Sequence, residues 1–346
     1  STASRRRNKQ PDAAGVCTPI DHHVFQLLTA CQHETDPFDG PSLIDRFGDF
    51  RISTDLAASN STVDFSSNER VHFTAQFSKN IQWTLKITGK ESGAVKIIEG
   101  FDRELTADNS RWNGTTTELP LFRNEDCLVE LIIPEEDSLT TSVEISVTGT
   151  RTYEGSPITG FEEDLGTNLF FGNFEFELTG LTGRRNDIPA GEGEYFYFFE
   201  GTDNVVANFF VGLIQIFPSV NGETYFSMPT TIPEESYFNF FLWGDGTPNT
   251  IAVIQFFTDS NGDGSFTDGV DQSFQLEGDF PLAHTGWQAF SHTMADVGMT
   301  QSELEELVAV QVLLISNLNG QPNPPEPVRF GLDFMTFTQD QPLQLE

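Results

Sequence analysis

The chain has 346 residues, which is enough for two domains that each bury a hydrophobic core. It carries 52 acidic residues against 18 Lys and Arg, a formal net charge of −34 at pH 7. Because nucleic acids and anionic lipid surfaces attract basic proteins, this charge argues against both as partners. Cations, calcium above all, and neutral ligands such as sugars suit it better.

The negative charge is concentrated in the second half of the chain. Residues 152–346 contain only three basic residues, Arg184, Arg185 and Arg329, and no lysine follows Lys96. The negative side chains of so acidic a folded domain repel one another, and salt or bound divalent cations would weaken this repulsion. Two interpretations stay open, namely a surface adapted to high salt and a charge with a specific function.

Residues 1–40 are predicted to be a signal segment and a flexible tether. The run Leu27-Leu-Thr-Ala-Cys31 resembles a bacterial lipobox, in which the cysteine is lipidated, and an acidic stretch follows it. Cys31 is therefore the predicted lipidation site. The preceding apolar stretch covers only residues 24–30, shorter than most signal peptides require, so a chance match is the alternative. No stretch approaches the roughly 18 apolar residues of a membrane-spanning helix.

Residues 41–155 are predicted to form an immunoglobulin-like β-sandwich. Short apolar runs at 71–77, 81–88, 94–98, 116–122, 127–133 and 143–150 are separated by Gly, Asn, Asp or Pro, which is typical of such a fold. Trp83 and Trp112 are expected in the core. The three cysteines are too widely spaced to predict a disulfide framework, and Cys127 is expected to be a buried thiol.

Residues 156–346 are predicted to form a larger jelly-roll β-sandwich. Strand-like runs occur at 169–178, 195–200, 205–217, 236–243, 250–257, 271–276, 287–292, 308–316 and 328–338. The one predicted helix covers 300–307, where Thr300 and Glu303 form a capping box. With 33 Phe residues and no other convincing helix, the whole chain is predicted to be all-β.

The clearest chemical motif is the acidic loop at residues 259–271. Its oxygen-bearing residues are Asp259, Asn261, Asp263, Asp268 and Asp271. Side-chain oxygens at alternate positions followed by Gly264 are how a loop wraps a hard cation, although Val270 stands where an EF-hand has Glu. Because strands flank it, we predict an EF-like calcium loop on a β-hairpin. A plain Asn-Gly or Asp-Gly turn without an ion is the alternative.

A second acidic group is predicted to lie where the first and last strands of the jelly roll meet. Glu162, Glu163 and Asp164 open this domain, and Asp333 lies on its last strand. Neighbouring strands would let these carboxylates share a structural cation. Solvated surface charge is the alternative.

Aromatic residues on two predicted strands are the candidate ligand-binding residues: Tyr195, Tyr197, Tyr237 and Trp243. Flat rings stack on the apolar faces of sugars, while neighbouring polar side chains bond the hydroxyls. The alternative is that these rings fill the core. No catalytic motif stands out, and acidic residues are too abundant for paired carboxylates to indicate glycoside cleavage, so the chain is predicted not to be an enzyme.

Several of these features together resemble a known family. They are the opening Gly160-Phe-Glu-Glu-Asp164, the Tyr and Phe strands, the hairpin at 255–264, Gly286-Trp-Gln288 and the closing strand at 328–338. They are similar to the galactose-binding-like jelly rolls of bacterial carbohydrate-binding modules. In that family the opening acid and an Asp of the closing strand hold a structural calcium, which implies this role for Glu162, Glu163 or Asp164 together with Asp333.

The whole chain resembles two-domain surface lipoproteins of Bacteroidota type. The resemblance implies a non-catalytic, calcium-stabilised protein, lipid-anchored to the outer face of the outer membrane. It would bind a polysaccharide or oligosaccharide beside a glycan importer or other surface proteins. A structural or adhesive protein that assembles with other subunits is the alternative, favoured by the Phe-rich strands and low Trp content. A polysaccharide-active enzyme is a third hypothesis.

Overall fold

The computed structural model describes residues 49–136, 139–173, 178, 181–202, 210–218, 222–247, 249–276, 280–316 and 327–346. The chain divides into two units, Ser1–Gly48 and Asp49–Glu346, and the predicted lipidation site Cys31 lies outside the described residues. The described part consists mainly of strands, as predicted. None of its helices is long and apolar enough to cross a membrane.

Residues 52–149 form one six-stranded sheet. Its order is β1 (Ile52–Ala58), β3 (Phe73–Gly89), β5 (Asp126–Ile133), β6 (Leu139–Gly149) and β2 (Thr62–Asp64), and β4 (Val95–Leu105) pairs with β3. All pairs are antiparallel except β2 with β6. A short 3₁₀ helix, η1 (Phe65–Ser67), follows β2 and is capped by the Asp64 side chain. Here the strands belong to one sheet, whereas the sequence predicted two, and the immunoglobulin-like assignment stays a prediction.

The core of this sheet follows from alternation along its longest strand. β3 buries every second residue over most of its length, and Trp83 is fully buried among these side chains. Trp112 packs edge-on against two phenylalanine rings of the same core. Cys127 is a buried free thiol, as predicted, and burial raises its pKa to about 12, so it stays protonated at neutral pH.

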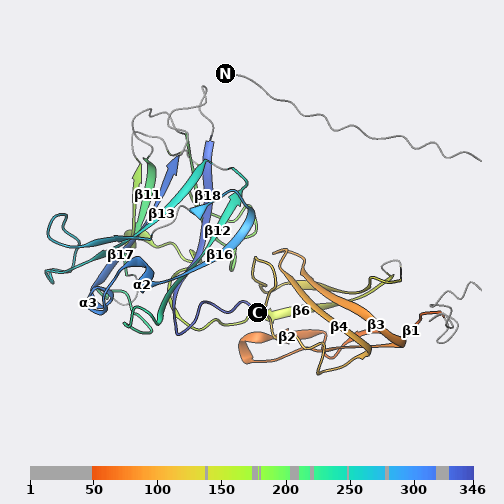
Figure 1. Cartoon of the computed structure of the whole chain (residues 1–346). Coiled ribbons are helices and arrows are strands. Elements are labelled where there is room, and N and C mark those ends of the chain that lie inside the picture. The colour runs from red at the N-terminus through yellow and green to blue at the C-terminus, as the bar shows by residue number, and fades with distance from the viewer. Residues whose placement is uncertain are drawn as a thin grey trace, which may run out of the picture. The chain divides into compact units, whose positions relative to one another are not determined.

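Residues 156–339 form two six-stranded sheets (Figure 1). The sheet named here the β18 sheet has the order β16 (Thr285–Thr293), β12 (Ser236–Asp245), β18 (Pro327–Gln339), β10 (Phe196–Thr202) and β9 (Gly183–Arg185), with β7 (Ser156–Thr159) on β18. The β17 sheet has the order β14 (Ser273–Gln275), β13 (Thr250–Thr258), β17 (Leu307–Ser316), β11 (Phe210–Ile216) and β8 (Leu169–Asn173), with β15 (Phe280–Pro281) on β13. This confirms the predicted β-sandwich.

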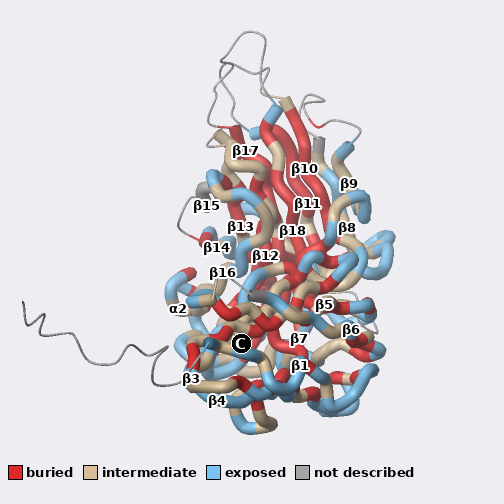
Figure 2. Tube along the Cα trace, turned by 90° about the vertical axis from the view of Figure 1, so that its right-hand side faces the viewer, coloured by how far each residue is buried: buried red, intermediate tan, exposed pale blue. Residues whose placement is uncertain are grey.

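The main core lies between these two sheets. Phenylalanine rings of the β18 sheet, such as Phe199 and Phe330 stacked at 4.5 Å, meet aliphatic side chains of the β17 sheet such as Ile254 and Val312. Figure 2 shows that buried residues run almost without interruption along β10, β11, β17 and β18. Strands that are buried on both faces lose the alternation of polar and apolar residues, which explains the high phenylalanine content.

Few helical turns complete the jelly roll. They are η2 (Gly166–Asn168), α2 (Met294–Val297) and α3 (Gln301–Glu305). The predicted capping box of Thr300 and Glu303 is present at the start of α3. This helix is shorter than the predicted 300–307, because Leu307 already begins β17.

Candidate functional site

The predicted aromatic residues do not lie together on one open surface. Tyr197 is only 7% exposed and packs in the core against Phe161, so its ring has no free face for a sugar. Tyr195 is half-buried, and the Arg184 guanidinium lies 3.4 Å from its ring centroid. One face of that ring is therefore already covered by a cation.

The other two aromatic residues lie near opposite ends of β12. Tyr237 pairs with Thr293, and Trp243 pairs with Trp287; Tyr237 and Trp243 are six residue steps apart along the strand, a distance of about 20 Å. Trp243 is half-buried against Phe198, with ring centroids 6.1 Å apart. These rings are thus separate features of the β18 sheet, and a ligand contact by any of them stays a prediction.

Carboxylates from three separate segments converge on the outer side of the β18 sheet. Asp333 on β18 is fully buried and accepts hydrogen bonds from the backbone N–H of Glu192 (2.8 Å) and of Phe334 (2.8 Å). Glu162 accepts the backbone N–H of Glu194 at 2.9 Å. The prediction that an acid of the 162–164 group lies near Asp333 therefore fits the positions of these two segments.

Glu192 is the member of this group that the sequence did not reveal. It lies in the loop before β10, between Gly191 and Gly193. Gly193 has φ +61°, a conformation that favours glycine, and a Cβ there would come within 2.5 Å of the Glu162 carboxylate, which would have to move aside. The paired glycines around an acidic residue are the one local signal of this arrangement.

The carboxylates of Glu162, Glu192 and Asp333 repel one another, although only Asp333 is fully buried, Glu192 is half-buried and Glu162 is exposed. Burial, and then the charge of Glu162, raise the pKa of Glu192 to about 7. Burial likewise raises the pKa of Asp333 well above its usual value. In the described part of the chain, no Lys or Arg forms an ion pair with any of the three. Uncompensated buried carboxylates favour either bound protons or a bound cation.

The other predicted acids of this group point elsewhere. Glu163 and Asp164 are exposed, and Asp164 accepts the backbone N–H of Gly166 at 2.9 Å. As the side chains stand, the described ranges contain no three Asp, Glu, His or Cys residues placed to hold a metal ion. A calcium ion beside Asp333 would therefore take backbone carbonyls or waters among its roughly six to eight oxygen ligands.

The acidic loop at 259–271 joins β13 to β14, so it lies on a β-hairpin as predicted. Asp259 is fully buried, and its carboxylate accepts hydrogen bonds from Gly262, Asp263 and Gly264 N–H and from the Tyr225 hydroxyl. Burial acts to raise the pKa of Asp259, but these hydrogen bonds together lower it. The loop is thus held by its own hydrogen bonds.

The remaining predicted ligands of this loop are mostly exposed. Asp271 accepts the backbone N–H groups of Asn261 (3.2 Å) and Thr267 (2.7 Å), and Asp263 accepts that of Ser265 (3.0 Å). Asp268 is exposed. These contacts are those of a polar turn, which was the alternative to the calcium loop.

A row of glutamine side chains crosses the outer face of the β17 sheet. Cross-strand pairing places its members side by side on five strands, in the order Phe170, Gln215, Gln311, Gln255 and Gln275. Gln311 donates to Gln255 at 2.7 Å, and Gln255 donates to Gln275 at 3.2 Å. Four interstrand spacings make this row about 19 Å long.

Apolar rows lie on both sides of the glutamine row. Leu213, Leu313 and Val253 form one of them and are 4–8% exposed. On the other side, Phe257 packs edge-on against Phe266 of the acidic loop, with centroids 4.5 Å apart. The glutamines themselves keep intermediate or high exposure, and Phe170 at the end of the row is 54% exposed. Each glutamine stands alone in an apolar strand, but only the register shows that they align.

No family model and no curated protein matches the chain. Similar solved structures include a carbohydrate-binding module of the β-sandwich superfamily, at 12% identity and TM-score 0.35 over 84% of this chain and 98% of that one. SGBP-B from a xyloglucan utilization locus in Bacteroides uniformis has 12% identity and TM-score 0.37 over 84% of this chain and 73% of that one. The family 30 carbohydrate-binding module of a Clostridium thermocellum cellulosomal cellulase has 12% identity and TM-score 0.35 over 51% of this chain and 93% of that one. What the chain binds depends on its own residues.

Proposed function

We propose that this protein binds a polysaccharide or oligosaccharide without cleaving it, on the outer face of the β17 sheet. The observation that carries the proposal is the glutamine row. Each carboxamide offers two N–H donors and an acceptor oxygen, and the two hydrogen bonds of the row use one donor each of Gln311 and Gln255 and the oxygens of Gln255 and Gln275 as acceptors. The remaining groups suit the many hydroxyls of a sugar chain lying along the row.

The surroundings of the row favour binding over cleavage. The apolar rows beside it and the exposed Phe170 ring would contact the C–H faces of sugar rings. The residues of these rows include no carboxylate or imidazole to act as general acid or base. A mutual chain of hydrogen bonds also holds the amides in fixed orientations before a ligand arrives, which lowers the entropic cost of binding.

We expect the Gln255→Ala/Gln311→Ala double variant to bind neutral glycans at least about tenfold more weakly than wild type, since several hydrogen bonds to the ligand are lost. The measurement is a screen of the protein on a glycan array, followed by titration calorimetry with the strongest neutral oligosaccharide. Gln82→Ala is the matched control, because Gln82 is a half-buried strand glutamine on β3, in the separate N-terminal sheet.

Two results would contradict the proposed binding surface: no glycan bound by wild type, or equal affinity in wild type and double variant. The alternative function, assembly with other subunits through the same apolar rows, gives a different result. In that case light scattering would show an oligomer of wild type that the double variant or Phe170→Ala disrupts, and no glycan would bind.

We further propose that calcium stabilises the jelly roll beside Asp333, Glu192 and Glu162. The fully buried Asp333 and the half-buried Glu192, neither of which pairs with a described Lys or Arg, support this position, whereas Asp259 already accepts four hydrogen bonds. Oxygen-rich sites of this kind suit calcium. The proposed cell-surface location, with a lipid anchor at Cys31 in the outer membrane and a glycan importer or other surface protein as partner, rests on the sequence resemblance.

Calcium is expected to raise the melting temperature of wild type and EDTA to lower it. At a concentration about 100 times the Kd, calcium would add about 2.7 kcal/mol of stability. Asp333→Asn should abolish the calcium response, whereas Asp271→Asn in the acidic loop should keep it. The reverse pattern would place the ion in the loop, and a melting temperature insensitive to both calcium and EDTA would exclude a structural calcium.

A further inference from the structure

A polar cavity of about 910 Å³ lies within the Asp49–Glu346 unit. Three segments supply most of its lining, namely the turn at 65–70 that includes η1, the connection 151–155 between β6 and β7, and residues 338–344 at and beyond the end of β18, and Asn113 and Pro229 complete it. Its volume falls within the range of about 300–1,000 Å³ typical of small-molecule sites. Most of the lining side chains are polar or charged, so a polar ligand is the kind that fits.

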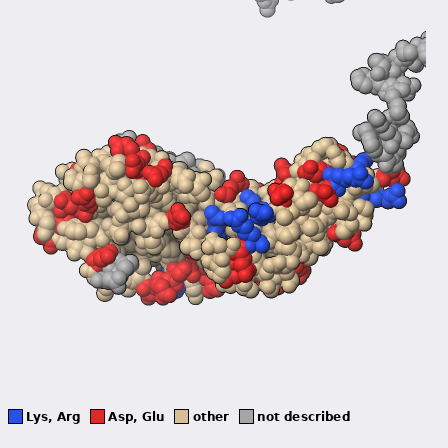
Figure 3. Space-filling model, turned by 90° about the horizontal axis from the view of Figure 1, so that it is seen from below, with Lys and Arg blue, Asp and Glu red and all other residues tan. Residues whose placement is uncertain are grey.

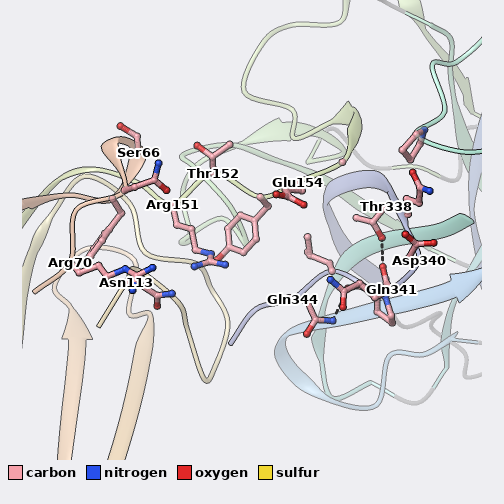
Figure 4. A pocket seen from close by; sticks show the side chains of 18 of the residues that line it. Ser66, Arg70, Asn113, Arg151, Thr152, Glu154, Thr338, Asp340, Gln341 and Gln344 are labelled. Atoms are coloured by element: carbon pink, nitrogen blue, oxygen red, sulfur yellow. Dashed lines mark hydrogen bonds between the residues drawn. The ribbon is translucent and has the colours of Figure 1, made fainter. Parts of the chain in front are cut away.

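Two arginines without carboxylate partners line this cavity. In the described part of the chain, neither Arg70 nor Arg151 forms an ion pair. The Arg151 guanidinium lies 5.6 Å from the Tyr153 ring centroid, and its Nε is buried without a hydrogen-bond partner. Figure 4 shows Arg70, Asn113 and Arg151 on the same side of the cavity. A buried N–H without a partner is costly unless a ligand satisfies it.

The arginines of the jelly roll differ from Arg70 and Arg151. The three basic residues of the jelly roll, Arg184, Arg185 and Arg329, all bind backbone carbonyls or carboxylates. Figure 3 shows that acidic side chains are spread over the face it presents, while basic ones gather in a few groups. Other described arginines, such as Arg51 and Arg111, also lack an ion pair, but Arg70 and Arg151 line one cavity together, where they can share an anionic group from outside the chain.

The facing side of the cavity has a different character. Figure 4 places Thr338, Asp340, Gln341 and Gln344 there. The Thr338 hydroxyl donates to the Gln341 carbonyl at 2.7 Å, and Gln344 donates to a backbone carbonyl at 2.8 Å. Asp340 offers acceptors for hydroxyl groups. This side, like the carboxylates of Glu69 and Glu154 elsewhere in the lining, would repel a second negative charge but would bind the hydroxyls of a sugar.

We propose that the cavity binds an acidic sugar unit, whose carboxylate or sulfate group lies between Arg70 and Arg151 and whose hydroxyls face Asp340 and the amides. Planar guanidinium groups bind such oxyanions with paired hydrogen bonds. This inference rests on the proposed glycan binding and adds the class of sugar recognised. Inorganic sulfate would satisfy only the arginine side, and a polyanion would be repelled by the net charge of −34.

The test is titration calorimetry with glucuronic acid, glucose 6-sulfate, glucose and inorganic sulfate. We expect the two acidic sugars to bind wild type at least about tenfold more tightly than glucose or sulfate. Glucose has no anionic group for the arginines, and sulfate has no sugar hydroxyls for the facing side. Stronger binding of glucuronic acid would identify a uronate, and stronger binding of glucose 6-sulfate a sulfated sugar. The Arg70→Gln/Arg151→Gln double variant should lose the preference, while Arg111→Gln, an exposed arginine that does not line the cavity, should keep it.

Melting curves will show whether each variant is folded. Arg151→Lys gives a second check, because lysine keeps the positive charge but cannot form the paired hydrogen bonds. This variant should bind the acidic sugars with intermediate affinity. Equal affinity for glucose and glucuronic acid, or unchanged affinity in the double arginine variant, would overturn the inference. Binding of neutral glycans to the glutamine row is measured separately with Gln255→Ala/Gln311→Ala. Failure of the cavity and failure of the proposed binding surface are therefore distinguishable.

Discussion

The calcium-free protein is expected to lose stability as the pH rises from about 4.5 to about 7. In the folded protein, burial and the Glu162 charge raise the pKa of Glu192 from 4.5 to about 7. In the unfolded chain this carboxyl ionises near its ordinary pKa. Between the two values the folded state holds more protons, so the free energy of unfolding falls as the pH rises. The stabilisation is complete below the unfolded pKa and is lost by about pH 7.

A shift of this size corresponds to roughly 3 kcal/mol, and the raised pKa of Asp333 acts in the same direction. The measurement is urea denaturation across this pH range in EDTA. Bound calcium stabilises the ionised carboxylates, so the fall should be reduced with calcium present. General repulsion within so acidic a chain also grows with pH, and matched variants separate this effect.

Glu192→Gln removes the titrating group and should flatten the pH dependence in EDTA. Glu163→Gln removes one exposed carboxylate nearby and should leave it as in wild type, because it retains the buried group. A fall of equal slope in wild type and in the Glu192→Gln variant would show that general repulsion, and not this buried group, sets the pH dependence.

The candidate acidic site shows what a single sequence can and cannot predict. The proximity of the 162–164 group to Asp333 could be expected from the resemblance to a jelly roll. Glu192 could not, because it comes from a loop whose position is set by packing on the β18 sheet. Which of three consecutive acids contacts the loop before β10 also depends on the hydrogen bonds of the folded chain, and here it is Glu162.

The strands show a related limit. Alternation in the run from Tyr195 to Phe199 predicts that Tyr197 and Phe198 face opposite sides, but not which side is the main core. Phe198 lies on the outer side of the β18 sheet among other large side chains, so both faces are apolar and the pattern has no polar face to identify. The sequence therefore predicts a ligand contact for Tyr197, whereas in the structure its ring packs in the core.

The glutamine row depends on register, which no single strand records. Gln215, Gln255 and Gln311 are spread over almost a hundred residues, and each looks like an isolated polar residue. A shift of one residue in any pairing would turn its glutamine into the core. The same reasoning applies to the N-terminal sheet. The spacing of its apolar residues predicts the strands, but it does not predict that all six strands belong to one sheet.

In that N-terminal sheet, Gly100→Ala is expected to destabilise the protein by roughly 1–3 kcal/mol, the usual cost of overpacking a core. Gly100 on β4 pairs directly with Trp83 on β3, and the fully buried indole lies over the glycine. A Cβ at position 100 would come within 2.2 Å of the Trp83 ring. The rigid ring has no flexible end that can move aside, so ring and strand must separate.

Urea denaturation of two further variants separates this clash from the general effect of a substitution on β4. Phe101→Ala changes the next residue, whose side chain is 59% exposed, and should alter stability by less than about 0.5 kcal/mol. In a Trp83→Leu background the clash disappears, so Gly100→Ala should cost much less there than in wild type. Equal costs in both backgrounds would show that the indole does not require glycine at position 100, and that the destabilisation has its origin in the backbone of β4.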